Sequence, residues 1–227
     1  MKYDLIIVSQ SRSDLVQTTQ NCIDSARKDD ADLNIIIVET GQPYKYDVDK
    51  IIEYNGEFNY NRALNMGLKY AKGDVRILAN NDILFHKGWS EIGYLMELNG
   101  YHSASYPNQN WKSKGLEKGD VLYEGYSIGL HITGWCIFMD RYCHEQIGLL
   151  DESVNFWFSD NLYAYQIKAA GIKHALFCNC QVDHLVSRTL VKQNVTLQRN
   201  YTMGQQRICK ERERYYAERK RVYQVNT

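Results

Sequence analysis

The chain has 227 residues, of which 44% are hydrophobic and 24% charged, and its 27 basic residues balance its 27 acidic ones. This composition is typical of a globular protein and excludes a low-complexity chain. No apolar run approaches the roughly 20 residues of a membrane span, which excludes an integral membrane helix from the expected elements.

The charges are unevenly distributed along the chain. Residues 1–187 carry 17 Lys and Arg against 24 Asp and Glu, a net charge of −7, whereas residues 188–227 carry 10 against 3, a net charge of +7. We therefore expect a catalytic domain over 1–187 and a basic C-terminal arm over 188–227. Such an arm favours an anionic partner.

The six cysteines have no spacing typical of a disulfide framework. The chain also begins with an apolar strand pattern rather than with a basic segment and an apolar leader. Both observations predict a cytoplasmic protein with reduced thiols and no transmembrane segment.

The first half alternates strand and helix patterns. The expected elements are a strand at 5–8, a helix from Ser13 or Asp14 to about 28, a strand at 33–39, a helix at 59–72 closed by Gly73, and a strand at 74–79. This order indicates an α/β fold with a parallel sheet and right-handed crossovers.

The second half is less regular. A long loop or lid is expected over 106–130, followed by a strand at 131–140, a helix at 141–147, a helix at 160–170, a strand at 173–178 and a helix from about 198 to 223. Long loops inside compact domains are often functional.

Asp82 follows the apolar strand pattern and two amides, Asn80 and Asn81. Ligands bind at strand ends in open α/β sheets, and carboxylate and amide oxygens suit Mg²⁺ or Mn²⁺. The alternative is a capped turn, since Asn and Asp both favour turns and helix starts.

Several segments, in this order and spacing, resemble the family 2 glycosyltransferases, which have the GT-A fold. They are Ile6–Arg12, Ile36–Gly41, Phe58–Gly67 with Ala71–Asp74, Asn80–Asp82, Gly134–Arg141 with Ile147–Glu152, Phe158–Asp160 before Ala170–Gly171, and Val182–His184 with Ser187. The resemblance covers about residues 3–188.

The resemblance implies a Rossmann-like GT-A fold with a C-terminal helical extension. It implies an inverting transfer of a sugar from a nucleotide-diphosphate sugar, expected to be a UDP-sugar. It assigns the catalytic base to Asp160, the divalent metal (Mn²⁺ or Mg²⁺) to Asp82 and His184, and the acceptor side to Gly134 and Trp135. The nucleotide sugar would contact Ser9, Ser11, Arg12, Glu39, Asn61, Arg62, Asn65, Asn80 and Asn81.

The chemistry of these residue types agrees with such a reaction. A cation neutralises a departing diphosphate, and a carboxylate at a helix start, where the dipole favours its ionised form, suits a general base. Three positions depart from the family pattern: Asn80 replaces the first acid of Asp-x-Asp, Ser159 replaces a Glu, and Leu162 replaces a commonly acidic residue. These changes weaken the expectation of metal dependence.

Each candidate also has a structural alternative. Asp160 could serve only as a helix cap, His184 as a core or loop histidine, Glu39 as the end of a strand, and Trp135 as a packing aromatic.

Three other functions compete with glycosyl transfer. Gly125–Gly129 matches the Gly-x-Ser-x-Gly pattern of a serine hydrolase with Ser127 as nucleophile, but the residues that follow are not helical. His174, Cys178, Cys180 and His184 could hold zinc, although their spacing is not that of a common zinc site. A catalytically silent module that binds nucleotide sugar or nucleic acid is the third alternative.

The acceptor is the least determined feature. The basic residues and tyrosines of 198–227 could contact nucleic acid or an anionic membrane surface, or form a solvated helix with local Glu pairs. The expected acceptor is therefore a hydroxyl on a glycan, or on a hydroxymethylated base of phage-type DNA.

Overall fold

The computed structural model describes residues 1–12, 15–107, 115, 117, 119, 122–179, 181–185 and 195–225, with the side chains of 202–219 in the last segment. The helices are α1 (Val16–Ala26), α2 (Tyr60–Leu68), α3 (Glu91–Asn99), α4 (Arg141–Ile147), α5 (Ser159–Ala169) and α6 (Val195–Val225). The strands are β1 (Lys2–Ser9), β2 (Asp32–Glu39), β3 (Lys50–Glu53), β4 (Val75–Asn80), β5 (Ile83–Phe85), β6 (Ser103–Ser105), β7 (Leu122–Glu124), β8 (Cys136–Asp140), β9 (His174–Phe177) and β10 (Val182–His184).

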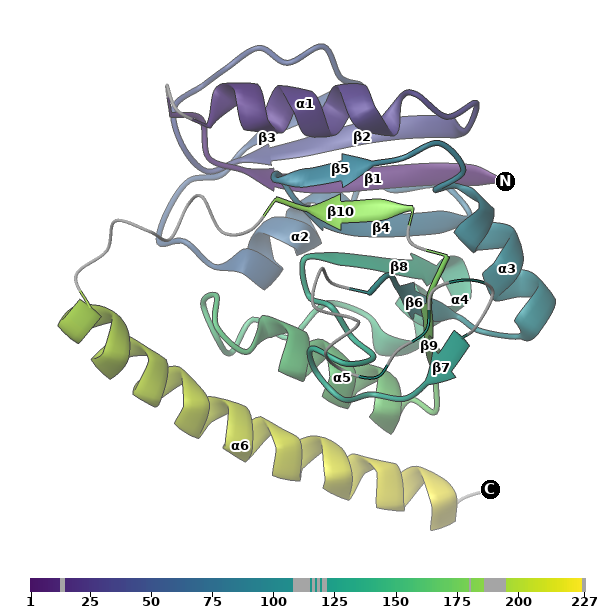
Figure 1. Cartoon of the computed structure of the whole chain (residues 1–227). Helices are drawn as coiled ribbons and strands as arrows, with labels where there is room; N and C mark the ends of the chain where they lie inside the picture. The colour runs from purple at the N-terminus through teal and green to yellow at the C-terminus, as the bar shows by residue number, and fades with distance from the viewer. Residues whose placement is uncertain are drawn as a thin grey trace.

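A central sheet organises the described part of the chain, with strand order β3-β2-β1-β4-β8-β6-β9-β7 (Figure 1). The first four strands in this order run parallel, and β8 lies antiparallel between β4 and β6. A separate antiparallel pair joins β5 to β10. The expected α/β fold with a mostly parallel sheet is confirmed.

Strand β1 is apolar at every position from Leu5 to Val8 because both faces of the sheet are covered. Leu5 and Ile7 pack into the cluster on one face of the sheet, whereas Ile6 and Val8 pack into the cluster on the other. Successive side chains of a strand point to opposite faces, so a strand covered on both faces needs apolar residues at every position.

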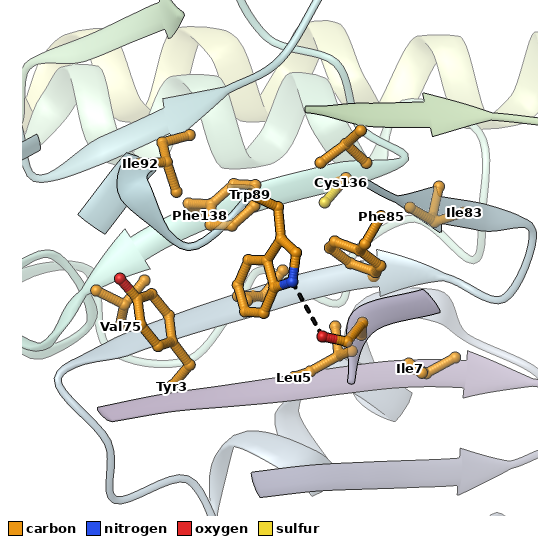
Figure 2. Packing of buried hydrophobic residues seen from close by; sticks show 14 of the residues in the cluster. Tyr3, Leu5, Ile7, Val75, Ile83, Phe85, Trp89, Ile92, Cys136 and Phe138 are labelled. Atoms are coloured by element: carbon orange, nitrogen blue, oxygen red, sulfur yellow. Dashed lines mark hydrogen bonds between the residues drawn. The ribbon is translucent and has the colours of Figure 1, made fainter. Parts of the chain in front are cut away.

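Trp89 is the largest fully buried side chain and lies in the first of these clusters (Figure 2). Its ring makes edge contacts with Tyr3 and Phe85, at centroid distances of 5.2 and 5.3 Å. Its Nε1 donates to the carbonyl of Ala26, 3.0 Å away, at the end of α1. A buried indole N–H needs such an acceptor, and this hydrogen bond ties α1 to the segment that follows β5.

Helix α2 is shorter than the 59–72 expected from the sequence. The Asn59 side chain caps it by accepting from the Arg62 amide, and its C-cap is Lys69. The chain then turns sharply to reach Gly73, where a Cβ would lie 2.8 Å from the Lys2 carbonyl oxygen. This close approach to β1 leaves no room for a side chain at Gly73.

The strand expected over 131–140 begins only at Cys136. The amides of Leu130, His131 and Ile132 all point to the Ser127 carbonyl oxygen, so this stretch is a turn. β-branched residues made it look extended, but tertiary packing overrode that local preference.

Several short elements were not expected from the sequence: β3, β5, β6, β7, β10 and α3. Strands of three or four residues carry too little periodicity to be recognised locally. Part of the expected 106–130 loop, and the Ser13 and Asp14 cap positions, lie outside the described residues. Leu15 is the N-cap residue of α1.

Helix α6 runs along α5 at the outside of the α/β body (Figure 1). Of the α6 side chains that the structure describes, Gln205, Cys209 and Tyr216 are buried, and they share one face of the helix. Gln205 accepts from the Asn155 amide at 2.6 Å, and the Cys209 sulfur lies 3.7 Å from the Tyr165 hydroxyl. The expected C-terminal helix is therefore present, and one of its faces is docked. The domain boundary at 187/188 stays a prediction, because residues 186–194 lie outside the described part.

Candidate functional site

Strands β1, β2 and β4 run parallel and end side by side, at Ser9, Glu39 and Asn80. This common edge is where an open α/β sheet binds ligands. Asn81 and Asp82 form the turn that follows β4, and Asn81 donates to the Thr19 hydroxyl at 3.0 Å. On the other side, the Asp82 carbonyl accepts from the Leu185 amide at 2.9 Å, so the turn is held between α1 and the end of β10.

Asp82 lies beside His184, which is 102 positions away in the sequence. Antiparallel pairing of β10 with β5 places His184 opposite Ile83. His184 Nε2 lies 3.1 Å from Asp82 Oδ1, and both side chains are largely buried. Because a carboxylate only accepts, Nε2 carries the hydrogen of this bond.

The geometry of this pair fits a divalent cation. Ligands at neighbouring corners of an octahedron lie about 3 Å apart when each bond is about 2.1 Å long. The 3.1 Å separation matches that spacing, and a cation would replace the proton between the two atoms. Among the described residues, no three His, Cys, Asp or Glu side chains gather into a metal site. A cation here would thus need oxygens from its ligand to complete its coordination.

Trp135 packs directly on His184. The two rings are stacked, with centroids 5.3 Å apart and an interplanar angle of 7°. The Trp135 carbonyl accepts from the Asn80 amide at 2.9 Å, so the residue is also tied to the end of β4. In the described part of the chain, the indole Nε1 is buried without a hydrogen-bond partner.

Tyr60 links the Asp82 side of the site to Asp160. Its hydroxyl donates to Asn80 Oδ1 at 2.8 Å. Burial raises the pKa of Tyr60, and the nearby Cys136, Asp82 and Asp160 add to the increase. Both carboxylates therefore lie close enough to Tyr60 to act on it electrostatically, although the sequence alone did not single out this residue.

Asp160 lies in the first turn of α5, after an unusual backbone position. Phe158, the N-cap residue, has φ of +70°, in the left-handed region that a non-glycine residue seldom adopts. The Asp160 carboxylate accepts from the Asn161 amide at 2.9 Å. Strain of this kind, about 1–3 kcal/mol, is found mainly at functional positions.

The electrostatic expectation for Asp160 was wrong in direction. We expected the helix start to favour its ionised form, but burial outweighs the amide hydrogen bonds and raises the pKa of the carboxyl. A carboxylate with a raised pKa holds a proton more tightly, which makes it a stronger base.

Apart from Asn80 and Asn81 at the end of β4, the residues expected to contact the nucleotide form two separate groups. In the first group, Glu39 is buried and accepts from the Ser11 amide at 2.7 Å, the Ser11 hydroxyl at 2.6 Å and the Gly41 amide at 2.7 Å. Ser9 bonds Thr19 at 3.1 Å, and Arg12 is exposed in the loop after β1. Glu39 thus holds together the two loops that follow β1 and β2.

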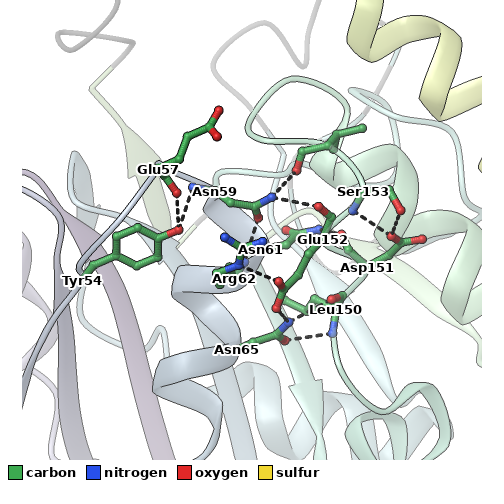
Figure 3. A network of polar contacts seen from close by, with 11 residues as sticks. Tyr54, Glu57, Asn59, Asn61, Arg62, Asn65, Leu150, Asp151, Glu152 and Ser153 are labelled. Carbon is green, nitrogen blue, oxygen red and sulfur yellow. Dashed lines mark hydrogen bonds and ion pairs between the residues drawn. The ribbon is translucent and has the colours of Figure 1, made fainter.

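The second group, Asn61, Arg62 and Asn65 on α2, faces the 150–155 segment (Figure 3). Asn61 donates to the Asp151 carbonyl at 2.7 Å, and Asn65 donates to the Leu150 carbonyl at 2.9 Å. Arg62 pairs with Glu152 at 2.7 Å. These bonds fasten the segment that leads into α5 and Asp160. Asn61 also lines a small cavity beside Asp160 and Gly134.

The same segment is held from its other side by α6, a contact that the sequence analysis missed. Asp151 Oδ2 accepts from Arg212 Nε at 2.6 Å and from the Tyr216 hydroxyl at 3.0 Å. The strongly basic composition of this region drew attention to external partners, yet Arg212 is used internally.

The structure does not support the two competing arrangements of catalytic or metal-binding residues. Ser127 lies in a turn rather than before a helix, and its amide points to His131 Nδ1 at 3.2 Å. His174 is buried between the Ser103 hydroxyl and the His131 carbonyl, at 2.8 and 3.1 Å, and burial lowers its pKa to about 4. Cys180 lies outside the described residues.

Two solved structures with a similar fold hold Mn²⁺ together with a nucleotide or a nucleotide sugar. One is GalNAc-T7 with UDP, GalNAc and Mn²⁺, at a TM-score of 0.65 and 13% identity over 81% of this chain. Another is the mannosyltransferase PcManGT from Pyrobaculum calidifontis in complex with GDP-Man and Mn²⁺, at 0.60 and 12% over 83%. The chain has a GT-A glycosyltransferase fold.

At these identities the likeness concerns the fold. The chain spans 43% of the GalNAc-T7 chain and 58% of the mannosyltransferase chain. No family model and no curated protein matches the sequence. None of the helices in the described part is long and apolar enough to cross a membrane.

Proposed function

We propose that this protein is a metal-assisted inverting glycosyltransferase of the family 2 type that uses a nucleotide-diphosphate sugar. The observation that carries the proposal is the pairing of Asp82 with His184 at the strand edge. Asp160 lines a small cavity together with Tyr60, whose hydroxyl bonds Asn80 at the end of β4. The GT-A fold supports it, since the two similar structures hold a nucleotide or nucleotide sugar with Mn²⁺.

The proposed reaction is a direct displacement at the anomeric carbon. Asp160 accepts the proton of the acceptor hydroxyl, and the oxygen of that hydroxyl attacks the anomeric carbon. The bond between the anomeric carbon and the diphosphate oxygen breaks in the same step. A cation held by Asp82 and His184 would neutralise the charge of the leaving diphosphate. The raised pKa of Asp160 supports its role as the base.

The donor nucleotide is proposed to lie over the loops after β1 and β2. Ser9, Ser11, Arg12 and Glu39 belong to these loops or to the strand ends before them. Glu39 already accepts three hydrogen bonds, so its contribution would be to shape the loop. We propose a UDP-sugar, on the resemblance to family 2.

The acceptor is proposed to be a glycan hydroxyl, with a hydroxymethylated DNA base as the second candidate. The exposed face of α6 mixes charges: Arg207 and Glu211 lie one turn apart at 4.0 Å, and Glu213 and Glu218 are also exposed. Local Glu pairs reduce the attraction for phosphates. Assays with oligosaccharides and with hydroxymethylcytosine duplex, at low and high salt, distinguish the two acceptors.

Donor binding is tested by thermal unfolding with UDP, GDP and their sugars, in Mn²⁺ and then in EDTA. We expect UDP to raise the melting temperature of the wild type only when Mn²⁺ is present. The Asp82→Ala variant should lose this increase, because it removes the anionic ligand of the cation. Asp183→Ala, which alters an exposed carboxylate on β10, is the matched control and should keep the increase.

An increase that is equal in Mn²⁺ and in EDTA would contradict the metal role of Asp82. An absence of any increase with every nucleotide would contradict the proposed function and favour the silent-module alternative.

Gly134 gives a second test of the site, because it makes room for Asp160. A Cβ at Gly134 would lie 2.6 Å from Asp160 Cβ and 2.9 Å from its Oδ2, closer than real contacts allow. We expect Gly134→Ala to displace the carboxylate and to lower the transfer rate by about 10²-fold. Gly204→Ala, whose Cβ would meet open space on α6, should leave the rate unchanged. Equal rates in the two variants would contradict the role of this contact.

A further inference from the structure

Trp135 has a buried hydrogen-bond donor that the protein does not satisfy. Within the described residues, its Nε1 is enclosed by protein atoms and lacks an acceptor. The indole of Trp89, in contrast, donates to the Ala26 carbonyl at 3.0 Å. Leaving a buried donor unpaired is costly, so such groups in a native protein call for an explanation. A ligand that brings its own acceptor provides one.

The position of Trp135 indicates which ligand that would be. Its ring is parallel to that of His184, with centroids 5.3 Å apart. His184 Nε2 is in turn 3.1 Å from Asp82 Oδ1. The indole is therefore in van der Waals contact with the imidazole that forms half of the candidate cation pair. A phosphate oxygen bound to a cation at that pair would therefore lie beside the imidazole on which the indole stacks.

The chemistry of the ligand matches the chemistry of the donor. An indole N–H only donates, and a diphosphate offers only acceptor oxygens. The backbone of Trp135 is fixed by the hydrogen bond from the Asn80 amide to its carbonyl. Stacking on His184 restricts the ring further. A donor held in this way is already oriented, and only the protein atoms that cover Nε1 have to move aside before it can stabilise charge that develops on a leaving group.

We propose that Trp135 Nε1 donates a hydrogen bond to a phosphate oxygen of the nucleoside diphosphate, while its ring keeps His184 oriented toward Asp82. This inference rests on the proposed function and deepens it. It moves Trp135 from the acceptor side, where the sequence had suggested it, to the leaving-group side. The hydrogen bond strengthens as negative charge accumulates on the diphosphate, so it assists departure as well as binding.

Two variants separate the donor from the ring. Trp135→Phe removes the N–H and keeps an aromatic ring to stack on His184, whereas Trp135→Leu removes both. We expect Trp135→Phe to weaken the binding of UDP with Mn²⁺ about tenfold, as for the loss of a hydrogen bond to a charged group. Binding of uridine, which has no phosphate, should be unchanged. Trp135→Leu should weaken the binding of UDP further.

Calorimetric titration of the full chain with UDP and with uridine measures these affinities. Trp157→Phe, a change of a half-buried tryptophan outside the stack, is the control and should bind UDP like the wild type. An NMR spectrum of the indole N–H groups gives an independent reading. The signal missing from Trp135→Phe should move downfield when UDP and Mg²⁺ are added to the wild type.

Wild-type affinity for UDP in Trp135→Phe, with no movement of that signal, would overturn the inference and leave Trp135 as a packing residue. Equal loss of UDP and uridine binding would also overturn it, because the N–H would then not act on the phosphates. A wild-type protein that binds neither UDP nor GDP would instead refute the proposed function itself.

Discussion

Asp160→Asn is expected to lower glycosyl transfer by about 10²–10⁴-fold, while the binding of UDP with Mn²⁺ stays at the wild-type level. The amide keeps the size of the side chain but cannot take a proton from the acceptor, and general-base catalysis contributes an effect of this order. Steady-state rates and a UDP titration on the same preparation measure both quantities. Wild-type rates in the variant would exclude Asp160 as the base.

The same variant has a predicted effect on stability. Burial raises the pKa of Asp160 in the folded protein above the ordinary value for Asp, about 3.9. The folded state then binds this proton more tightly than the unfolded state does. The wild type therefore loses stability as the pH rises from about 3.9 through the folded pKa, and this deficit is complete above that pKa.

The amide introduced by Asp160→Asn does not titrate, so this variant should melt at a higher temperature than the wild type at pH 7. The difference should shrink as the pH falls toward about 4, where the wild-type carboxyl is protonated in both states. Asp183→Asn, at an exposed carboxylate, should show no such gain. A variant that is less stable than the wild type at pH 7 would show that the carboxylate has a structural partner which outweighs its burial.

Arg212→Ala is expected to lower the free energy of unfolding by about 2 kcal/mol. It should also lower the rate of glycosyl transfer while the residues at the ends of β1, β2 and β4 keep their positions. Arg212 and Tyr216 both donate to Asp151 Oδ2, and Asp151 is almost fully buried. Hydrogen bonds to a charged group are worth about 1.5–3 kcal/mol. Removal of the Arg212 guanidinium leaves the buried Asp151 carboxylate without its opposite charge and with one hydrogen bond fewer. Because the 150–155 segment leads to α5, its loosening should also misplace Asp160.

Urea unfolding compares Arg212→Ala with Lys210→Ala, which removes an exposed cation from the same helix. The Lys210→Ala variant should change the free energy of unfolding by less than about 0.5 kcal/mol. Equal effects in the two variants would mean that Arg212 stabilises the protein no more than any other basic residue of α6.

The pH dependence of the free energy of unfolding gives a further check on the pairing of Arg212 with Asp151. Burial acts to raise the pKa of Asp151, but hydrogen bonds from Ser153, Arg212 and Tyr216 outweigh it and lower that pKa.

Because the pKa of Asp151 is lowered in the folded state, its carboxylate stabilises the fold fully above a pH of about 3.9. This stabilisation is lost as the pH falls through the pKa that Asp151 has in the folded state. The stability difference between the wild type and Arg212→Ala should therefore narrow in acid. A difference that stays constant down to the acid transition would contradict this ion pair as the source of the effect.

The main elements of the fold were predictable because their signals are local. The apolar run of β1 and the alternation of strands with helices are encoded within short stretches of sequence. Short strands such as β5 and β10 were not predictable. They form only because distant segments meet, and three residues carry no period of their own.

The candidate site likewise has features that local sequence patterns predict and contacts that only the folded chain creates. The sequence by itself determined that Asp82 follows an apolar strand and that Asp160 lies at a helix start, because strand ends and helix starts have local patterns. Only the tertiary structure decided that His184 lies 3.1 Å from Asp82, that Trp135 stacks on His184 and that Arg212 bonds Asp151. These contacts join residues between 49 and 102 positions apart, and packing of the whole domain rather than any local preference brings them together.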